Sequence, residues 1–226
     1  EALCEQGRNF GNKIWNAYRL VNGWTVDGTL AQSDNDRLAG EWFRQTLRRA
    51  VAELDGNFGS YRISEAFMLL YKLFWDDFSG WYLEMIKPAY GAPIDPRTVD
   101  EAKGFFDALL RLLHPFMPFV TEEIWQDLAP RAAGESIQPQ ADEQADEALL
   151  ARFELVKETI TAVRNIRKQK NLPQREALTL EVIADANYPA DYAPVLTKMA
   201  NLSAIERVAE KDAAAAAFIV KTTQYF

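Results

Sequence analysis

The stretch Arg8-Asn-Phe-Gly-Asn-Lys-Ile-Trp-Asn-Ala-Tyr-Arg-Leu20, near the start of the 226-residue chain, indicates which type of fold the protein adopts. When these residues are placed on a helical wheel at about 100° per residue, the apolar side chains form one narrow stripe: Phe10, Ile14, Ala17 and Val21. The opposite side of the wheel carries a second group: Arg8, Asn12, Trp15 and Arg19, with Asn16 beside them. One apolar face and one polar face predict an amphipathic helix whose apolar stripe is buried in a bundle.

Helical periodicity continues from this segment through most of residues 1–130. It predicts five helices, at 3–24, 34–55, 60–88, 95–114 and 118–129. Pro88 and Pro115 end the third and fourth helices because proline lacks a backbone N–H, whereas Pro118 suits the first turn of a new helix. Short connections and the lack of a strand pattern predict an all-α bundle over residues 1–130.

The pattern changes after residue 130. Residues 131–147 are rich in Pro, Gly, Ala, Gln, Asp and Glu, which indicates a linker or an exposed loop. The remaining pattern predicts a long basic helix, a strand, a helix and two short strands, at 148–171, 177–183, 189–201, 204–208 and 216–220. We therefore expect a mainly α chain in which the helical bundle is followed by a small α+β module, 148–226, that is truncated at its C-terminus.

The composition is that of a globular protein, with 48% hydrophobic and 26% charged residues. The sequence contains no run of eighteen apolar residues, so no membrane-spanning segment is expected. Its first residues lack the pattern of a signal peptide. The single cysteine, Cys4, rules out an internal disulfide and indicates a reducing compartment. These features lead us to expect a cytoplasmic protein.

The net charge of −8 speaks against a nucleic-acid partner, but the charge is unevenly placed along the chain. Between positions 157 and 175 one acid, Glu158, stands against six basic residues: Lys157, Arg164, Arg167, Lys168, Lys170 and Arg175. The segment from Gly7 to Leu20 holds three basic residues and no acid. These two local positive stretches are compatible with an RNA surface.

The first positive stretch combines side chains that suit unpaired RNA bases. Guanidinium groups pair with phosphate or stack on bases, carboxamides bind base edges, and an indole offers a stacking surface. The candidate RNA-binding residues are Arg8, Asn12, Lys13, Trp15, Asn16 and Arg19 in the first helix and Arg164, Arg167, Lys168 and Lys170 in the basic helix. The alternatives are that the first face packs against a neighbouring domain and that the basic helix is simply solvated.

Patterns of catalytic and metal-binding residues are lacking. The single histidine, His114, lies between Leu113 and Pro115 at a predicted helix end, which favours a structural or capping role. Asp76 and Asp77 are adjacent, so on a helix they point about 100° apart and do not form an acid/base pair. The sequence has no Gly-rich phosphate loop and no Cys/His cluster for zinc. We expect no catalytic residue, no metal and no cofactor in this chain.

Four motifs resemble those of valyl-tRNA synthetases and occur in that family's order. Residues 8–19 are similar to the signature R-N-F-x-N-K-(L/I)-(W/Y)-N-A-x-R-F, which opens the anticodon-binding bundle; Leu20 departs from its final Phe. Residues 74–87, FWDDFSGWYLEMIK, resemble the family's W-x-x-F-x-x-W-Y-(L/I)-E-x-x-K helix. Residues 112–125, LLHPFMPFVTEEIW, match a segment shared by the valyl, leucyl and isoleucyl enzymes. Residues 162–173, AVRNIRKQKNLP, resemble the valyl pattern that follows the bundle.

The resemblance implies an ATP-dependent valine–tRNA ligase of which this chain is the anticodon-binding part. The family's active-site signatures, H-I-G-H and K-M-S-K-S, are absent from this sequence, so ATP binding and catalysis are implied for a domain upstream of Glu1. The implied partners are valine tRNA and that catalytic domain, in a monomeric enzyme. Two alternatives stay open: the equivalent domain of an isoleucyl- or leucyl-tRNA synthetase, and a helical protein-interaction module without RNA binding.

Overall fold

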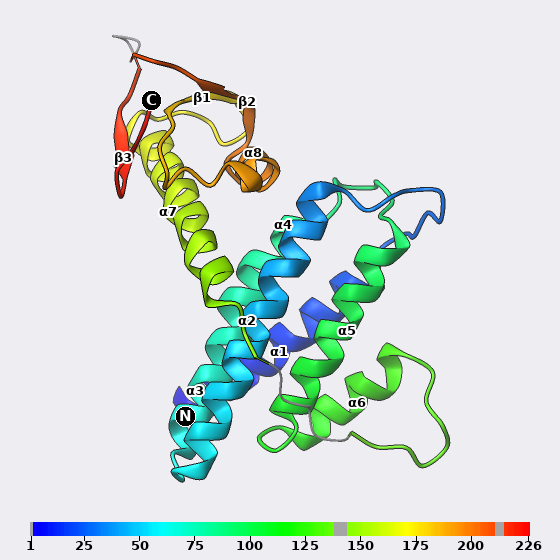
Figure 1. The fold of residues 1–226 in the computed structure, drawn as a ribbon. Coiled ribbons are helices and arrows are strands. Elements are labelled where there is room, and N and C mark those ends of the chain that lie inside the picture. Colours follow the sequence, from blue (N-terminus) through cyan, green and yellow to red (C-terminus); the bar gives the residue numbers. More distant parts are fainter. Residues whose placement is uncertain (1, 138–143, 211–214) are drawn as a thin grey trace. The chain divides into compact units, whose positions relative to one another are not determined.

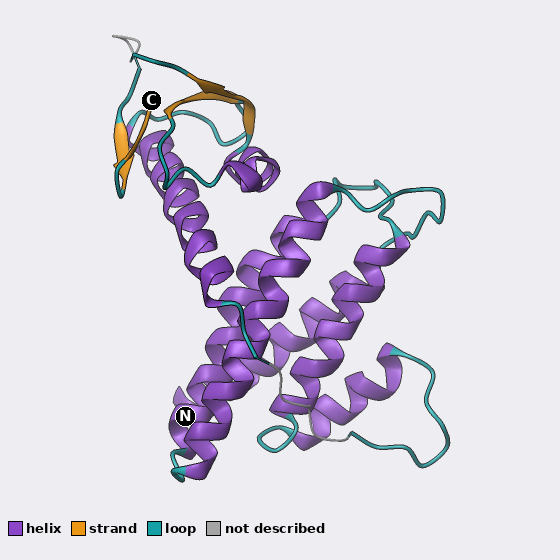
Figure 2. Ribbon diagram, in the orientation of Figure 1, coloured by secondary structure: helices purple, strands orange, loops and turns teal. Residues whose placement is uncertain are grey.

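The computed structural model describes residues 2–137, 144–210 and 215–226 (Figure 1). They form two compact units, Glu1–Ala145 and Asp146–Phe226. The first unit is a helical bundle and the second combines helices with a small sheet (Figure 2), so the mainly α fold expected from the sequence is confirmed. The division between the two units falls between Ala145 and Asp146, within the predicted linker at 131–147.

The helical segments of the first unit are, in order, α1 (Ala2–Asn22), α2 (Asp34–Gly59), α3 (Ile63–Lys72), η1 (Leu73–Tyr82), α4 (Leu83–Ile86), α5 (Pro96–Leu113) and α6 (Pro118–Leu128). Side-chain caps begin two of them. Ser33 Oγ accepts a hydrogen bond from the N–H of Asp36 at 3.1 Å, and Asp95 Oδ1 accepts one from the N–H of Thr98 at 2.9 Å. These caps satisfy N–H groups that have no partner within the helix, so they fix the starts of α2 and α5.

The predicted helix at 60–88 corresponds to three segments that follow one another without a break, α3, η1 and α4, of which η1 is a π-helix. A π-helix closes i→i+5 hydrogen bonds in place of the usual i→i+4 bonds. It carries buried aromatic rings into the core, where Tyr82 stacks on Phe43 of α2 with ring centres 5.1 Å apart. Phe43 also lies 5.1 Å from Phe105 of α5. These rings join η1, α2 and α5 in one core.

The turn between α5 and α6 lies where Pro115 and Pro118 predict it, because α5 ends at Leu113 and α6 begins at Pro118. His114 lies in this turn, and its Nδ1 is 2.9 Å from Thr121 Oγ1 in α6. Thr121 Oγ1 also donates a hydrogen bond to the carbonyl of Met117 at 2.8 Å. His114 therefore connects the two helices across the turn, which is a structural role.

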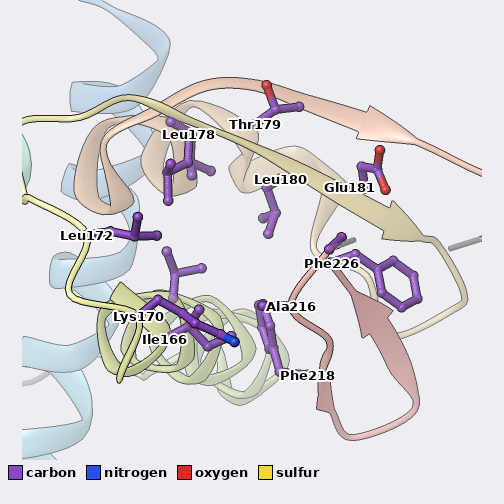
Figure 3. Close-up of a pocket in the computed structure, with 13 residues that line it drawn as sticks. Ile166, Lys170, Leu172, Leu178, Thr179, Leu180, Glu181, Ala216, Phe218 and Phe226 are labelled. Atoms are coloured by element: carbon purple, nitrogen blue, oxygen red, sulfur yellow. The ribbon is translucent and has the colours of Figure 1, made fainter. Parts of the chain in front are cut away.

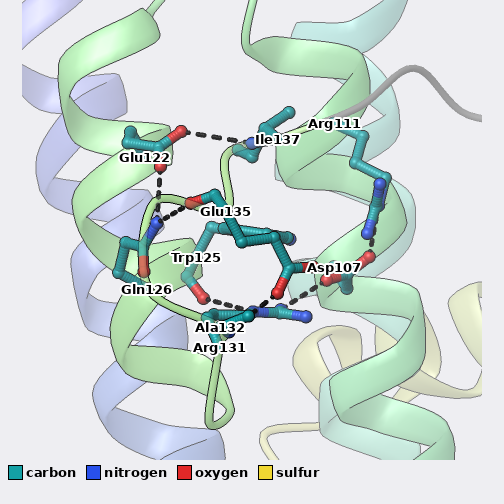
Figure 4. Close-up of polar contacts among 9 residues, drawn as sticks. All are labelled: Asp107, Arg111, Glu122, Trp125, Gln126, Arg131, Ala132, Glu135 and Ile137. Atoms are coloured by element: carbon teal, nitrogen blue, oxygen red, sulfur yellow. Dashed lines mark hydrogen bonds and ion pairs between the residues drawn. The ribbon is translucent and has the colours of Figure 1, made fainter.

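The segment after α6 is fastened to the bundle by Arg131 (Figure 4). Arg131 Nη2 donates a hydrogen bond to Asp107 Oδ1 in α5 at 2.7 Å, and its guanidinium carbon lies 3.7 Å from the centre of the Trp125 ring. Further along, Gln126 Nε2 donates to the carbonyl of Glu135 at 2.7 Å. The first part of the predicted linker, 131–137, is thus packed on the bundle, and 138–143 lie outside the described residues.

The elements of the second unit are α7 (Glu147–Gln169), β1 (Leu178–Ile183), the 3₁₀-helix η2 (Ala190–Tyr192), α8 (Ala193–Ala200), β2 (Leu202–Arg207), β3 (Phe218–Val220) and β4 (Thr223–Tyr225). The strands that the structure describes form one sheet in the order β2-β1-β4-β3. β1 pairs in parallel with β2, and β4 pairs antiparallel with both β1 and β3. The parallel pair is connected through α8, as parallel neighbours require a crossover.

Most of this unit agrees with the sequence prediction. β2 begins two residues earlier than the predicted strand at 204–208, β3 is shorter than 216–220, and β4 is not predicted at all. β4 has only three residues, which is too short for a period of two to be recognised. The core of the unit is built from α7, where Phe153, Val156, Ile160 and Val163 are buried, and from Leu180, Val182 and Tyr225 of the sheet.

Candidate nucleic-acid interface

The apolar stripe of α1 is buried, as the helical wheel predicts: Phe10, Ile14, Ala17 and Val21 all lie in the core. Phe10 packs against three rings of the α3–η1 helix, with its ring centre 4.7 Å from Tyr71, 5.8 Å from Phe74 and 6.0 Å from Phe67. This packing directs the opposite face of α1 away from the bundle core.

The exposed face of α1 carries the predicted polar residues. Arg8, Asn12, Asn16 and Arg19 are exposed, whereas Lys13 and Trp15 are partly buried. The side chains of Asn12, Trp15, Asn16 and Arg19 line one surface hollow of about 280 Å³. Arg8 does not line this hollow; its guanidinium forms a loose, exposed ion pair with Glu5 at 3.8 Å. The structure therefore brings four of the six predicted α1 residues together.

The rotation of α1 about its own axis is fixed by Tyr18. Its hydroxyl donates a hydrogen bond to the carboxylate of Asp127 in α6 and accepts one from Asn22 Nδ2 at 3.1 Å. Burial, together with the bond to the Asp127 carboxylate, raises the pKa of Tyr18 to about 12, because an ionised phenol would lie beside another negative charge. Trp15 packs edge-on against Tyr18 with ring centres 5.8 Å apart, so this contact also positions the indole.

Lys13 lies at the other border of the exposed face, next to the ring of Trp75, which is not among the predicted RNA-binding residues. Its Nζ is 5.3 Å from the centre of the Trp75 ring in η1, within the range of a cation–π contact. Trp75 is partly exposed and stacks on Tyr71 with ring centres 5.4 Å apart. The sequence contains the FWDDFSGWY motif around Trp75, but which of its rings reaches the surface depends on the π-helical turn.

Of the four residues predicted to bind RNA in and at the end of the basic helix α7, three are exposed and one is buried. Lys168 and Lys170 are exposed, and so is Arg164, whose Nη2 donates to the carbonyl of Met199 at 3.1 Å. Arg167 is buried, with only 1% of its surface exposed, so the expectation that it contacts RNA is corrected. The three remaining residues do stand on the surface of the unit.

The guanidinium of Arg167 donates hydrogen bonds to four backbone carbonyls. Its Nη1 donates to the carbonyls of Pro173 and Glu176, at 3.1 and 2.8 Å. Its Nη2 donates to those of Ala200 and Asn201, at 3.0 and 2.9 Å. The last two carbonyls stand at the C-terminus of α8, where the helix dipole favours a cation. Arg167 therefore holds the end of α7, the turn after it and the end of α8 together.

An apolar hollow of about 350 Å³ lies beside Lys170 in the second unit (Figure 3). Leu178 and Leu180 project from β1 toward α7 in this view, and Ile166 and Lys170 face them from the helix. The described lining is mostly aliphatic and aromatic, with Leu172, Phe218 and Phe226 among its residues. This hollow is a partly open part of the core between α7 and the sheet, and its polar side chains are Lys170, Thr179 and Glu181.

The chemistry offered at α1 is that of binding. Two carboxamides and a guanidinium provide hydrogen bonds, and an indole beside them provides a flat stacking surface. Among the described residues, no group of His, Cys, Asp and Glu side chains is arranged to hold a metal ion. Within the same residues, no helix has the length and hydrophobicity needed to cross a membrane.

Comparisons with known proteins agree with this chemistry. The family model described as "Anticodon-binding domain of tRNA ligase" matches residues 40–184. The valine–tRNA ligase of Parabacteroides distasonis is 56% identical over the whole of this chain, which covers 26% of that relative's length. The enzymes of the same name from Phocaeicola vulgatus and Thermotoga maritima are 54% identical over the whole chain and 36% identical over 77% of it.

The region of similarity is wider than the family match itself. α1 precedes residue 40, but the relatives from P. distasonis and P. vulgatus align with the whole chain and so include α1. The chain spans about a quarter of the length of these curated relatives, 26% in both cases. By the match over residues 40–184, which is more than half of its 226 residues, the chain belongs to the family of anticodon-binding domains of tRNA ligases.

Proposed function

We propose that this chain binds the anticodon loop of valine tRNA for a valine–tRNA ligase, and that the exposed face of α1 contacts the anticodon bases. The observation that carries the proposal is the hollow lined by Asn12, Trp15, Asn16 and Arg19, on a chain of the anticodon-binding family. The valine assignment is supported by relatives of 54–56% identity that are named valine–tRNA ligases.

Each side chain of this face has a distinct role in the proposal. Asn12 and Asn16 bind the edges of unpaired bases, because a carboxamide offers both a donor and an acceptor. Arg19 and Arg8 bind phosphate groups and set the register of the loop. Trp15 stacks on a base, with its ring held in place by Tyr18. Lys13 stays close to the RNA backbone at the border formed by Trp75.

The same proposal assigns the remaining chemistry to other parts of the parent enzyme. ATP and valine are bound by a catalytic domain that is not part of this chain, and the present domain orients the tRNA so that its acceptor end reaches that site. Arg164, Lys168 and Lys170 of α7 add contacts with the tRNA backbone. The parent enzyme is a cytoplasmic monomer in this proposal.

The test uses the full-length enzyme that contains this chain. Aminoacylation is measured with valine, isoleucine and leucine, first on valine tRNA and then on the same tRNA with a different anticodon. We expect charging with valine only, and a kcat/KM that falls when the anticodon is replaced. Charging with isoleucine or leucine would reassign the parent enzyme, and an unchanged kcat/KM after anticodon replacement would remove the anticodon from the proposal.

A further inference from the structure

One end of the bundle exposes a cluster of large apolar side chains. They lie in or beside the α2–α3 turn and the α5–α6 turn. They are called here the end patch, which consists of the exposed Phe58, Tyr61, Ile63 and Phe119 together with the half-buried Phe116. Tyr61 and Phe119 are exposed to 90% and 91%. Isolated exposed apolar residues are ordinary, but a group of them gathered in one place marks an interaction surface.

The two turns form a continuous surface. Phe58 of the first turn stacks on Phe116 of the second with ring centres 6.1 Å apart, and Phe116 lies 5.3 Å from Phe67 of α3. The hydrogen bond between His114 and Thr121 holds the α5–α6 turn that carries Phe116 and Phe119. The end patch is therefore built on fixed backbone.

Tyr61 ends α2 in the left-handed backbone conformation. Its φ is +56°, and the N–H groups of Tyr61 and Arg62 donate hydrogen bonds to the carbonyls of Phe58 and Asn57, at 3.0 and 2.8 Å. These two bonds form a Schellman motif, a common end of an α-helix, so the positive φ follows from the turn. The turn leaves the Tyr61 side chain 90% exposed.

We propose that the end patch is covered by the part of the parent enzyme that precedes α1, as an interface between domains of one polypeptide. This inference rests on the proposed function, since it assumes the longer enzyme. The curated relatives are about four times as long as this chain, which covers 26% of them. α1 reaches this part of the bundle, because the ring of Phe10 lies 6.0 Å from that of Phe67, which in turn lies 5.3 Å from the ring of Phe116. Polypeptide that leads into α1 therefore approaches the bundle near the end patch.

The charges around the end patch favour protein over RNA as the occupant. Asp55 lies one turn before Phe58 on α2, Glu65 follows Ile63 on α3, and Glu123 lies one turn after Phe119 on α6. All three acids are exposed, and Arg62 is the basic residue within the α2–α3 turn. An acidic border repels phosphate, whereas an apolar centre with a charged rim is the usual anatomy of a protein interface.

The test measures how fast single cysteines at the end patch react with a maleimide in the full-length enzyme, with each site identified by peptide mapping. The variants are Tyr61→Cys and Phe119→Cys. The matched control is Tyr90→Cys, because Tyr90 is fully exposed in the loop between α4 and α5. We expect positions 61 and 119 to react about tenfold more slowly than position 90, since reaction requires the domains to open.

If the end patch is uncovered, or is covered by a second copy of the chain or by RNA, the labelling rates differ from this expectation. Equal rates at positions 61, 119 and 90 overturn the proposal. Protection that appears only at high enzyme concentration assigns the end patch to a second copy, and protection that appears only with added tRNA assigns it to RNA; both overturn it as well. Hydrogen exchange of segments 58–63 and 116–119 in the unaltered enzyme gives the same comparison without substitution. The comparison of positions 61 and 119 with position 90 needs neither valine nor tRNA, so a failure of the valine assignment leaves its outcome readable.

Discussion

Arg19 on α1 is exposed beside Asn16 and Trp15, whereas Arg167 on α7 is enclosed by four backbone carbonyls. Both arginines belong to locally basic stretches of the sequence, and both are predicted from it to bind RNA. Each helix is anchored by a buried polar side chain that bonds to another element, Tyr18 on α1 and Arg167 on α7. On α1 the anchor and the candidate interface are separate residues. On α7 one of the predicted RNA-binding residues, Arg167, is itself the anchor.

This difference shows that counting charge along a sequence does not distinguish a surface from a structural site. An arginine has five N–H donors in a planar fork, which fits a group of carbonyls as well as it fits a phosphate. The neighbouring residues decide between the two uses. Near Arg19 they are side chains that end in solvent, and near Arg167 they are the carbonyls at the end of α8.

The largest effect is expected from Arg167→Ala. Removing the guanidinium takes one donor from each of four backbone carbonyls and leaves a cavity inside the second unit, and we expect a loss of about 3–5 kcal/mol in the free energy of unfolding of that unit. Arg167→Lys should recover only part of the loss, because an ammonium lacks the planar fork. Chemical denaturation followed by circular dichroism measures both.

Lys168→Ala is the matched control for Arg167→Ala, as it removes the adjacent positive charge from an exposed position. It should change the stability by less than about 0.5 kcal/mol. If Arg167→Ala and Lys168→Ala are equally mild, Arg167 is not an anchor and the comparison between the two helices no longer holds.

Most helices and strands of the molecule are predicted from its sequence, whereas the contacts that α7 makes with other elements are not. The bundle, the basic helix and three of the four described strands are predicted because each has a clear apolar period. Phe153, Val156, Ile160 and Val163 are spaced by three and four residues, and Arg167 continues that spacing. This spacing places position 167 on the buried face of the helix. The partners of Arg167 are not visible in any sequence pattern, because α8 comes near α7 only through the fold.

On α1 the exposed and buried faces are both predicted, since a single helix determines them. The contacts that join α1 to other helices are not. Tyr18 meets Asp127 across 109 positions of sequence, and Lys13 meets Trp75 through a π-helix that no ten-residue pattern specifies. Sequence reasoning therefore finds the residues of this face but not the groups that fix its orientation.

The second-largest effect is expected from substitutions on the exposed face of α1. Asn12→Ala or Asn16→Ala in the full-length enzyme should lower the discrimination between valine tRNA and an anticodon-swapped tRNA by about 1–3 kcal/mol, the cost of one lost polar contact to a base. The measurement is the ratio of kcat/KM for the two tRNAs. Arg8→Ala and Arg19→Ala serve as the comparison, because lost phosphate contacts weaken both tRNAs alike. A wild-type ratio in every variant would mean that α1 packs against protein.

Tyr18→Phe tests the anchor of α1 and should cost about 1 kcal/mol, the usual worth of one hydrogen bond. The stabilisation that Tyr18 provides should also depend on pH. The folded pKa of Tyr18 is about 12, above its ordinary value of 10.0, so its contribution is complete below pH 10 and is lost as the pH rises from 10 toward 12. The stability difference between the wild type and Tyr18→Phe should shrink over that interval. A constant difference across it would show that burial and the bond to Asp127 do not hold the phenol neutral.

The smallest effects are expected from the exposed lysines of α7. If Lys168 and Lys170 contact the tRNA backbone, Lys168→Ala and Lys170→Ala should each reduce the slope of log affinity against log salt concentration by about 0.7–0.9, because each lost contact releases one counterion fewer. Lys87→Ala is the control, since it removes an exposed charge from the first unit that is not predicted to bind RNA. Filter binding at several salt concentrations measures the slopes. If all three variants keep the wild-type slope, Lys168 and Lys170 are removed from the proposed RNA surface, which then consists of the α1 face and Arg164.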